Sequence, residues 1–225
     1  MNKTYGGMQP VEKAATLANK VGAQLRAAIM AGAFNPGEKL THRSVADALH
    51  VSLTPAREAL FTLVSEGTLE GGPYGTIFVP TLKYDRIREL TKIRTLLEGL
   101  AAEEAATKLS NAAIANLVET HDQLINANER QDYRVLANLN WQFHFGIYEG
   151  AEMPIVQKMI ESCWLKTSSY YSTIYPKIAE SGEGIKNHHA IVQALQKRDP
   201  KKLAAAIRTD VEFGSQVLLS AVKEE

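Results

Sequence analysis

Apolar residues recur every three or four positions through most of the chain, which predicts a protein built chiefly from amphipathic helices. Between residues 84 and 223 the apolar patterns are all helical, and turn signals such as EGAEMP and KRDP separate them. The predicted helices are Asp85–Lys108, Asn111–Glu129, Asp132–Glu149, Pro154–Tyr175, Gly182–Lys197 and Pro200–Val222. The stretch Pro80-Thr81-Leu82-Lys83 is the natural linker to the preceding segment.

The segment before this linker mixes short helices with turns. VGAQLRAAIMAG predicts a helix that Gly32 ends, and the turn FNPGEKL follows it. Thr41 is placed to cap a second short helix, HRSVADAL. A third helix is expected to have Thr54 as its N-cap and Pro55 as its first residue, where the missing N–H of proline costs nothing. TLEGGPYGTIFVP then has the pattern of two strands joined by the tip GGPYG.

Two short helices joined by a tight turn and followed by a hairpin have the order of a winged helix-turn-helix. In that unit the second helix of the pair lies in the major groove of DNA, with its N-terminal residues at base edges and phosphates. Arg57 lies in the first turn of that helix, opposite the apolar stripe Ala59, Leu60, Leu63 and Val64. It is a candidate DNA contact, because arginine binds guanine or phosphate through two hydrogen bonds. The alternative is a surface arginine that pairs with Glu58 or Glu66.

Composition and charge narrow the class of protein. Of the 225 residues, 45% are apolar and 22% charged, which is ordinary for a soluble globular protein. The 25 basic and 25 acidic residues cancel, so DNA binding must depend on the local placement of a few side chains. No apolar run reaches the ~20 residues that span a bilayer, and the N-terminus lacks the apolar core of a secretory signal. Together with the single cysteine, Cys163, these features predict a cytoplasmic protein with no membrane partner.

The run GAFNPGEKL-THRSVADALHVSLTPAREALFTLVSEGTLEGGPYGTIFV resembles the DNA-binding domain of GntR-family transcription regulators. The stretches IRTLLEGLAAEEAA, WQFHFGIYEGAEMPI and HHAIVQALQKRDP are similar to the FCD-type C-terminal domain of the FadR subfamily. The resemblance implies a small α+β winged helix-turn-helix over residues 1–80 and an all-α helical bundle over residues 81–225, for effector binding and dimerisation. It also implies a homodimer that binds double-stranded operator DNA under the control of a small molecule, and no enzymatic activity.

The resemblance further implies which residues contact DNA. These are Arg43, Ser52, Leu53, Thr54 and Arg57, together with the wing-tip residues Tyr74 and Gly75. The family usually has an arginine where this chain has Leu53. Because leucine can make only apolar contacts, for example to a thymine methyl group, we expect an operator that differs from the usual one of the subfamily.

A metal site is implied by the same resemblance. In the metal-binding branch of the subfamily, an Asp and a His four residues apart join two later histidines around a divalent ion. The matching residues here are Asn140, His144, His188 and Asp210, so Asn replaces the Asp and Asp replaces the last His. Asn140 and His144 share one helix face, and the exchange keeps a single negative charge. Two imidazoles and a carboxylate suit Zn, Ni or Mn, with the amide as a weaker ligand.

Two alternatives to this direct coordination remain open. In the first, Asp210 reaches the ion only through water, because Asp is shorter than His. In the second, the pocket is metal-free, and His144 and Asp210 are hydrogen-bonded polar groups. The resemblance also assigns Arg94 to the effector cavity, with Asn140, His144 and His188. For Arg94 the alternative is an ion pair with Glu98, four residues on.

We expect an organic acid as the effector. The alternatives are a metal-free regulator that binds an acyl thioester or another apolar ligand, and a metalloenzyme whose catalytic ion is held by the histidines and Asp210. The aromatic residues Trp164, Tyr170, Tyr171 and Tyr175 are expected to pack in the core rather than to line a ligand site. His121 is expected to be solvated, and His189 to lie at the surface or beside the site.

Overall fold

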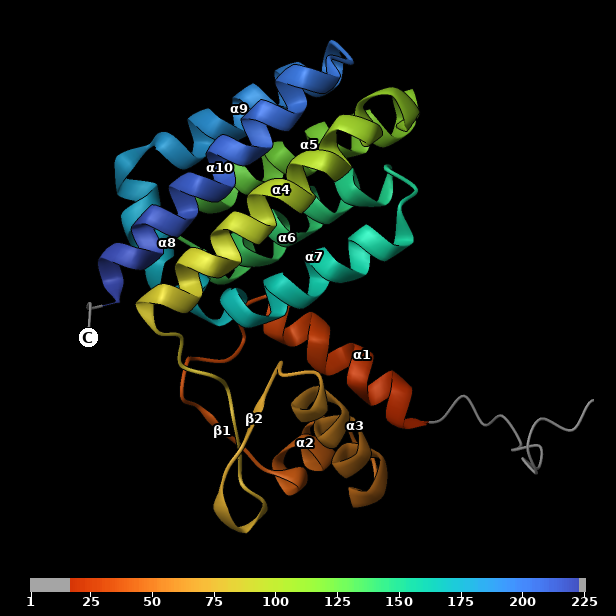
Figure 1. Ribbon diagram of the computed structural model, residues 1–225, viewed down its shortest axis with the longest axis vertical. Coiled ribbons are helices and arrows are strands. Elements are labelled where there is room, and N and C mark those ends of the chain that lie inside the picture. The colour runs from red at the N-terminus through yellow and green to blue at the C-terminus, as the bar shows by residue number, and fades with distance from the viewer. Residues whose placement is uncertain (1–16, 223–225) are drawn as a thin grey trace, which may run out of the picture.

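The computed structural model describes residues 17–222, and the first 16 residues and the last three lie outside the described part. The N-terminal stretch that lacks a signal pattern therefore falls outside it. A bundle of helices forms one part of the molecule and a small domain with a sheet forms the other (Figure 1). None of the helices that the structure describes is both long enough and apolar enough to cross a membrane.

The small domain contains the predicted helix pair and hairpin, together with a strand that the sequence analysis missed. Its elements are α1 (Leu17–Met30), β1 (Lys39–Leu40), α2 (His42–Ala48), α3 (Leu53–Ser65), β2 (Glu70–Gly71), the 3₁₀ turn η1 (Pro73–Gly75) and β3 (Ile77–Phe78). The strands form an antiparallel sheet in the order β1-β3-β2, with Leu40 opposite Ile77. A two-residue strand has no alternation to recognise, so only its distant partner β3 defines it.

The start of α3 corrects one prediction. Thr41 caps α2 through a reciprocal capping box with Ser44, as expected. In α3, however, the N-cap is Ser52 and the helix begins at Leu53, so Thr54 is not the cap and Pro55 is the third helical residue. The backbone N–H groups of the whole first turn have no partner within a helix, so proline fits at the third position as well as at the first. The buried face of α3 comprises Ala56, Ala59, Leu60 and Leu63.

The second part is all helical. It comprises α4 (Tyr84–Lys108), α5 (Asn111–Glu129), α6 (Tyr133–Glu149), α7 (Pro154–Thr167), the 3₁₀ turn η2 (Ser168–Tyr170), α8 (Tyr171–Ser181), α9 (Glu183–Gln196) and α10 (Pro200–Ala221). The segment predicted as one helix over 154–175 is thus two helices joined by η2, and α8 continues through Pro176 to Ser181. Gly182, with a φ of 68°, then separates α8 from α9. The long helices α4 and α10 pack side by side (Figure 1).

Helix α1 joins the two parts. It packs on α3 of the small domain and also contacts α7 and η2 of the bundle, and Figure 1 shows it running between them. An ion pair of 2.5 Å connects Arg26 of α1 to Glu66 at the end of α3. The apolar core is continuous across this junction. The bundle and the small domain are therefore packed against each other rather than joined by the linker alone.

Candidate functional site

The predicted DNA-contacting residues lie around one groove of the small domain. The groove is lined by His42, Leu53, Thr54, Arg57, Glu58, Phe61, Tyr74 and Gly75. The exposed side of α3 forms one wall, and the wing tip between β2 and β3 forms the other. Arg43 and Ser52 are exposed but are not part of this lining. The structure therefore brings most of the predicted set together, and it adds His42 and Phe61, which the sequence analysis did not consider.

Arg57 is exposed, and its guanidinium lies 5.3 Å from the centre of the Phe61 ring. One of its two predicted acidic partners, Glu66, is paired with Arg26 instead. Across residues 17–222, Arg57 forms no ion pair with Glu58. The cation thus stacks on an aromatic ring, and within the described part of the chain it pairs with neither of the two predicted acidic partners.

The wing tip is built to project outwards. Tyr74 is fully exposed and has a φ of 58°, a left-handed backbone conformation that non-glycine residues seldom adopt. Gly75 follows with a φ of 73°, and a Cβ added there would meet no atom within 4 Å. Consecutive left-handed residues make the short turn that carries the Tyr74 ring away from the body of the domain.

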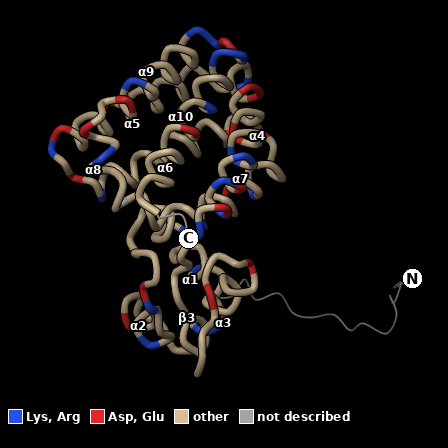
Figure 2. The backbone as a smooth tube through the Cα atoms, turned by 60° about the vertical axis from the view of Figure 1, so that its left-hand side comes forward, with Lys and Arg blue, Asp and Glu red and all other residues tan. Residues whose placement is uncertain are grey.

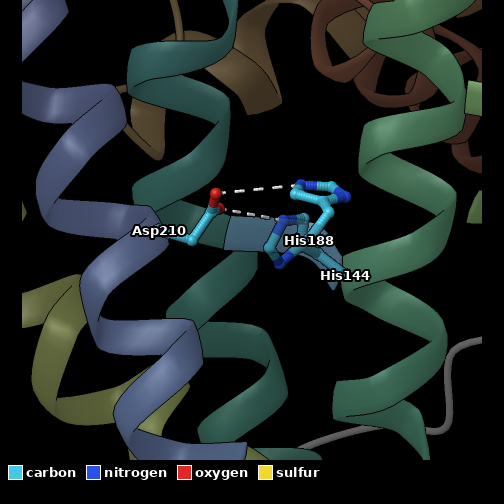
Figure 3. Close-up of side chains that lie close together, drawn as sticks. All are labelled: His144, His188 and Asp210. Carbon is cyan, nitrogen blue, oxygen red and sulfur yellow. Dashed lines mark ion pairs between the residues drawn. The ribbon is translucent and has the colours of Figure 1, made fainter. Parts of the chain in front are cut away.

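In the bundle, the predicted polar residues meet at one point although they come from three helices. Figure 3 shows His144 of α6, His188 of α9 and Asp210 of α10 facing one another. His144 Nε2 is 3.3 Å from Asp210 Oδ2, and His188 Nε2 is 3.8 Å from Asp210 Oδ1. One ligand-type atom from each residue lies within 4.8 Å of the other two. Asn140, one turn before His144 on α6, lines the same cavity.

A chain of hydrogen bonds behind His144 determines which of its ring nitrogens carries the proton. His144 Nδ1 is 3.1 Å from the hydroxyl of Tyr148, and that hydroxyl donates to Glu98 Oε2 at 2.5 Å. Burial raises the pKa of Tyr148 well above its usual value, so its proton stays in place. A tyrosine has only one proton to donate, so its oxygen must accept from His144 Nδ1–H. In neutral His144 the Nε2 lone pair then faces the Asp210 carboxylate.

Glu98 is the fully buried centre of this network. It accepts hydrogen bonds from Arg94 Nε at 2.6 Å and from Trp164 Nε1 at 2.9 Å, besides the one from Tyr148. Arg94 also donates to the Tyr171 hydroxyl at 2.6 Å and lies 4.7 Å from the centre of the Trp164 ring. The two interpretations of Arg94 are therefore compatible, because it pairs with Glu98 and also lines the cavity.

The residues present satisfy the requirements of a divalent-ion site. Burial lowers the pKa of His188 to about 3, so this imidazole is neutral and able to coordinate at neutral pH. Burial raises the pKa of Asp210, but the basic side chains that face it, Arg94 among them, together outweigh burial, so the pKa of this carboxyl is below its usual value. Two imidazole nitrogens and one carboxylate are a donor set suited to Zn, Ni or Mn. An ion would also relieve the contact between the Nε2 lone pair of His144 and the carboxylate.

The cavity beside these residues has a volume of about 50 Å³ and has two chemically different walls. Arg94, Asn140 and the triad of His144, His188 and Asp210 form the polar wall. The remaining wall is mostly apolar and includes Leu124, Leu136, Ile178, Ile185 and Phe213. Of the aromatic residues expected to be core, Trp164, Tyr171 and Tyr175 line the cavity as well as pack, whereas Tyr170 does not.

His121 corrects another prediction, because it is buried rather than solvated, with 2% of its surface exposed. Its ring lies 6.0 Å from that of His188 and 4.9 Å from that of His189, which is exposed. Burial lowers the pKa of His121, and His189 contributes to the shift. The signal was present in the sequence, since Ile114, Leu117, His121 and Leu124 form the buried stripe of α5.

Two other residues of the site were also missed. Tyr148 continues the four-residue spacing of Asn140 and His144 along α6, so the same helix periodicity could have identified it. The role of Trp164 could not have been found in this way, because its bond to Glu98 joins α7 to α4.

Comparison with known proteins divides the chain into the same two parts. The family model described as bacterial regulatory proteins, gntR family, matches residues 17–79, and the FCD domain model matches residues 89–213. The HTH-type transcriptional regulator McbR of Escherichia coli (strain K12) is 33% identical over 189 residues, which cover 83% of this chain and 86% of McbR.

The solved structure of E. coli McbR/YncC has a TM-score of 0.85 and 30% sequence identity, and the match covers 92% of this chain and 99% of that one. The uncharacterized HTH-type transcriptional regulator YdhC of Bacillus subtilis (strain 168) is 31% identical over 125 residues, or 54% of each chain. The similarity to McbR extends over both the sheet-containing domain and the helical bundle.

Proposed function

The chain belongs to the GntR family of bacterial regulatory proteins and carries an FCD domain, and from this we propose that it binds operator DNA as a homodimer controlled by a small organic acid held at a divalent ion. Family membership makes the protein a DNA-binding transcription regulator rather than an enzyme. The contact residues, the dimer, the ion and the chemistry of the effector are our proposals. We also propose that it belongs to the FadR subfamily and acts in the cytoplasm, where operator DNA lies.

The DNA contacts that we propose are those around the groove between α3 and the wing. Lys and Arg alternate with Asp and Glu along the described backbone (Figure 2), and the 25 basic and 25 acidic residues of the chain cancel, so overall charge does not favour non-specific DNA binding. Recognition must then come from single exposed side chains, and Arg57, the fifth residue of α3, presents donors that pair with no acidic side chain of residues 17–222. Leu53 offers an exposed apolar contact next to it, and Tyr74 and Gly75 would approach the minor groove.

This proposal can be tested with double-stranded DNA that the protein itself selects from a random library. Arg57→Ala should weaken binding by ~1–3 kcal/mol at matched salt while leaving the fold unchanged. Arg134→Ala is the matched control, because Arg134 is an exposed arginine of the bundle, and it should bind like the wild type. Wild-type affinity in Arg57→Ala would rule out Arg57 as a principal contact.

We propose that the dimer forms through α4 and α7. These two helices pack against each other and expose Ile93, Leu96, Leu100, Ile155 and Met159, each between 37% and 76% exposed. A two-fold interface brings the same surface of both copies together, so its charges must be self-complementary. Exposed Lys92 and Glu103 on α4 have opposite signs and meet that condition.

Sedimentation tests this interface. Leu96→Glu places a charge in the exposed apolar face of α4 and should convert the dimer to a monomer with unchanged helix content. Val135→Glu is the control, because Val135 is an exposed apolar residue of α6 outside the proposed interface. A dimeric Leu96→Glu variant would exclude this face.

The observation that carries the metal proposal is the arrangement around His144. The bond to Tyr148 directs the proton of neutral His144 to Nδ1, so its Nε2 lone pair and the Asp210 carboxylate are two acceptors 3.3 Å apart. Buried acceptors in contact are unfavourable unless a cation or proton lies between them. A divalent ion held by His144, His188 and Asp210 would act as a Lewis acid that binds an anionic oxygen. Asn140 would supply a weak ligand or bond the effector.

Charge and size support a small monoanion as the effector. The Arg94–Glu98 pair is neutral overall, so a divalent ion and Asp210 leave one net positive charge in the cavity. A carboxylate would compensate this charge, with a short apolar tail against Leu124 or Ile185. The cavity volume of about 50 Å³ disfavours a large acyl thioester. The apolar wall is the feature that would suit the alternative, an apolar ligand bound without a metal ion.

Metal content decides between these possibilities. Protein purified without chelators or metal-affinity resins should contain Zn, Ni or Mn, and chelation should lower its melting temperature. His144→Ala should abolish both effects, and Asn140→Asp should strengthen metal binding by adding a carboxylate beside the triad. Small carboxylic acids should then raise the melting temperature of the metal-loaded protein, whereas their amides should not. Absence of metal, with no response to added Zn, Ni or Mn, would favour the metal-free alternative.

A further inference from the structure

Two consecutive tyrosines at the junction of η2 and α8 connect the effector cavity to the linker of the DNA-binding domain. Tyr171 lines the cavity, and its hydroxyl accepts a hydrogen bond from Arg94 at 2.6 Å. The hydroxyl of Tyr170 accepts a hydrogen bond from the backbone N–H of Leu82, also at 2.6 Å. Leu82 belongs to the linker between β3 and α4. Adjacent Cα atoms are ~3.8 Å apart, so the two tyrosines cannot shift independently.

η2 lies where the bundle meets the DNA-binding domain. η2 also contacts α1, the helix packed between the two parts, so it touches both this helix and, through Tyr170, the linker. The linker begins at Pro80, directly after Val79. The backbone N–H of Val79 donates to the carbonyl of Glu38, and the carbonyl of Val79 accepts from the N–H of Gly37. The start of the linker is therefore hydrogen-bonded to the residues just before β1. A displacement of the linker would therefore be transmitted to the sheet that carries the wing.

The local geometry of η2 is that of a hinge rather than of a continuous helix. A 3₁₀ turn between two α-helices often marks a hinge, because its hydrogen bonds are less favourable than those of an α-helix. The buried side chain of Ser168 bonds the carbonyl of Trp164, the residue whose indole contacts Arg94 and Glu98. The hinge is thus attached to the buried network on one side and to the linker on the other.

We propose that Tyr170 is the positioning residue that transmits the state of the cavity to the DNA-binding domain. The inference rests on the proposed metal and effector site. Positive charge added at Asp210 acts on Arg94, which lines the same cavity and is bonded to Tyr171. A shift of Tyr171 moves Tyr170 and alters its bond to Leu82, which changes how the domain sits on the bundle. Ligand and DNA binding are then coupled, and the coupling must be reciprocal.

The experiment measures that coupling directly, with Zn²⁺ as the probe. The affinity of the full-length protein for Zn²⁺ is determined by competition with a chromophoric chelator, with and without DNA selected by the protein. In the wild type the ratio of the two affinities should differ from one by ~5–150-fold. Tyr170→Phe keeps the ring and removes the hydroxyl. It should bring the ratio to about one, while Zn²⁺ affinity without DNA and DNA affinity without Zn²⁺ stay as in the wild type.

Tyr84→Phe is the matched control, since Tyr84 begins α4 beside the linker and its hydroxyl forms no hydrogen bond to any residue between 17 and 222. It should keep the wild-type ratio. Hydrogen exchange at the Leu82 amide should accelerate in Tyr170→Phe and not in the control. Unchanged coupling in Tyr170→Phe, or a wild type that binds Zn²⁺ without coupling, overturns this inference alone. A wild type that binds no Zn²⁺ overturns the proposed metal site and this inference with it.

Discussion

Replacement of Glu98 by glutamine tests whether the buried network holds the effector domain together. Glu98 has no exposed surface and accepts hydrogen bonds from Arg94, Tyr148 and Trp164. Glutamine has the same shape but no charge, and one of its two terminal atoms is a donor. At least one of the three surrounding donors would therefore face another donor. The guanidinium of Arg94 would in addition remain buried without a compensating charge.

The size of the effect follows from these contacts. Removal of one partner from a buried ion pair costs about 3–5 kcal/mol, because the remaining charge stays desolvated. Burial lowers the pKa of Arg94, and in the wild type the Glu98 carboxylate more than offsets this effect. The variant loses that carboxylate but keeps the guanidinium, which is not deprotonated in proteins, so the positive charge stays buried without a partner. For a protein of this size each kcal/mol shifts the melting temperature by about 2–4 °C. Glu98→Gln should therefore melt about 6–20 °C below the wild type.

The assay is thermal melting followed by circular dichroism, with two comparison variants. Glu104→Gln lies on the same helix but breaks only a surface pair with Lys108, and it should change stability by no more than about 1 kcal/mol. The double variant Arg94→Met with Glu98→Leu removes both charges and should be more stable than Glu98→Gln. If Glu98→Gln melted within about 2 °C of the wild type, the network would not carry the stability assigned to it.

Three further predictions use the same structure. Tyr148→Phe should lower Zn²⁺ affinity by about 10–100-fold in a chelator competition, because His144 loses the acceptor that orients its ring. Unchanged Zn²⁺ affinity would contradict the proton position assigned to His144. Leu53→Arg should shift the DNA selected from a random library towards guanine at the contacted position, and an unchanged selection would exclude a base contact there. A fragment of residues 82–225 should be helical by circular dichroism and dimeric in sedimentation. An unfolded fragment would show that the bundle needs its packing against α1 to fold.

Much of the helical architecture could be predicted because its determinants are local. The bounds of α5, Asn111–Glu129, agree with the sequence prediction, since Ser110 caps its first turn and the apolar period runs to its end. Arg57 could be proposed from its place in the second helix of the pair, whereas Tyr74 and Gly75 were assigned through the resemblance, and the structure places all three around one groove. The break at η2 was not found, because the apolar pattern continues across it.

The sequence by itself determined the order of elements, the two-part organisation and the residue types available for chemistry. His144, His188 and Asp210 could be proposed as neighbours only through resemblance, since helix spacing relates residues of one helix and not of three. Tertiary packing alone decided that Tyr148 and Glu98 direct the proton of His144, and that His121 is buried. These contacts join residues far apart in the chain, so their geometry depends on how α4, α6, α9 and α10 pack, which no local pattern encodes.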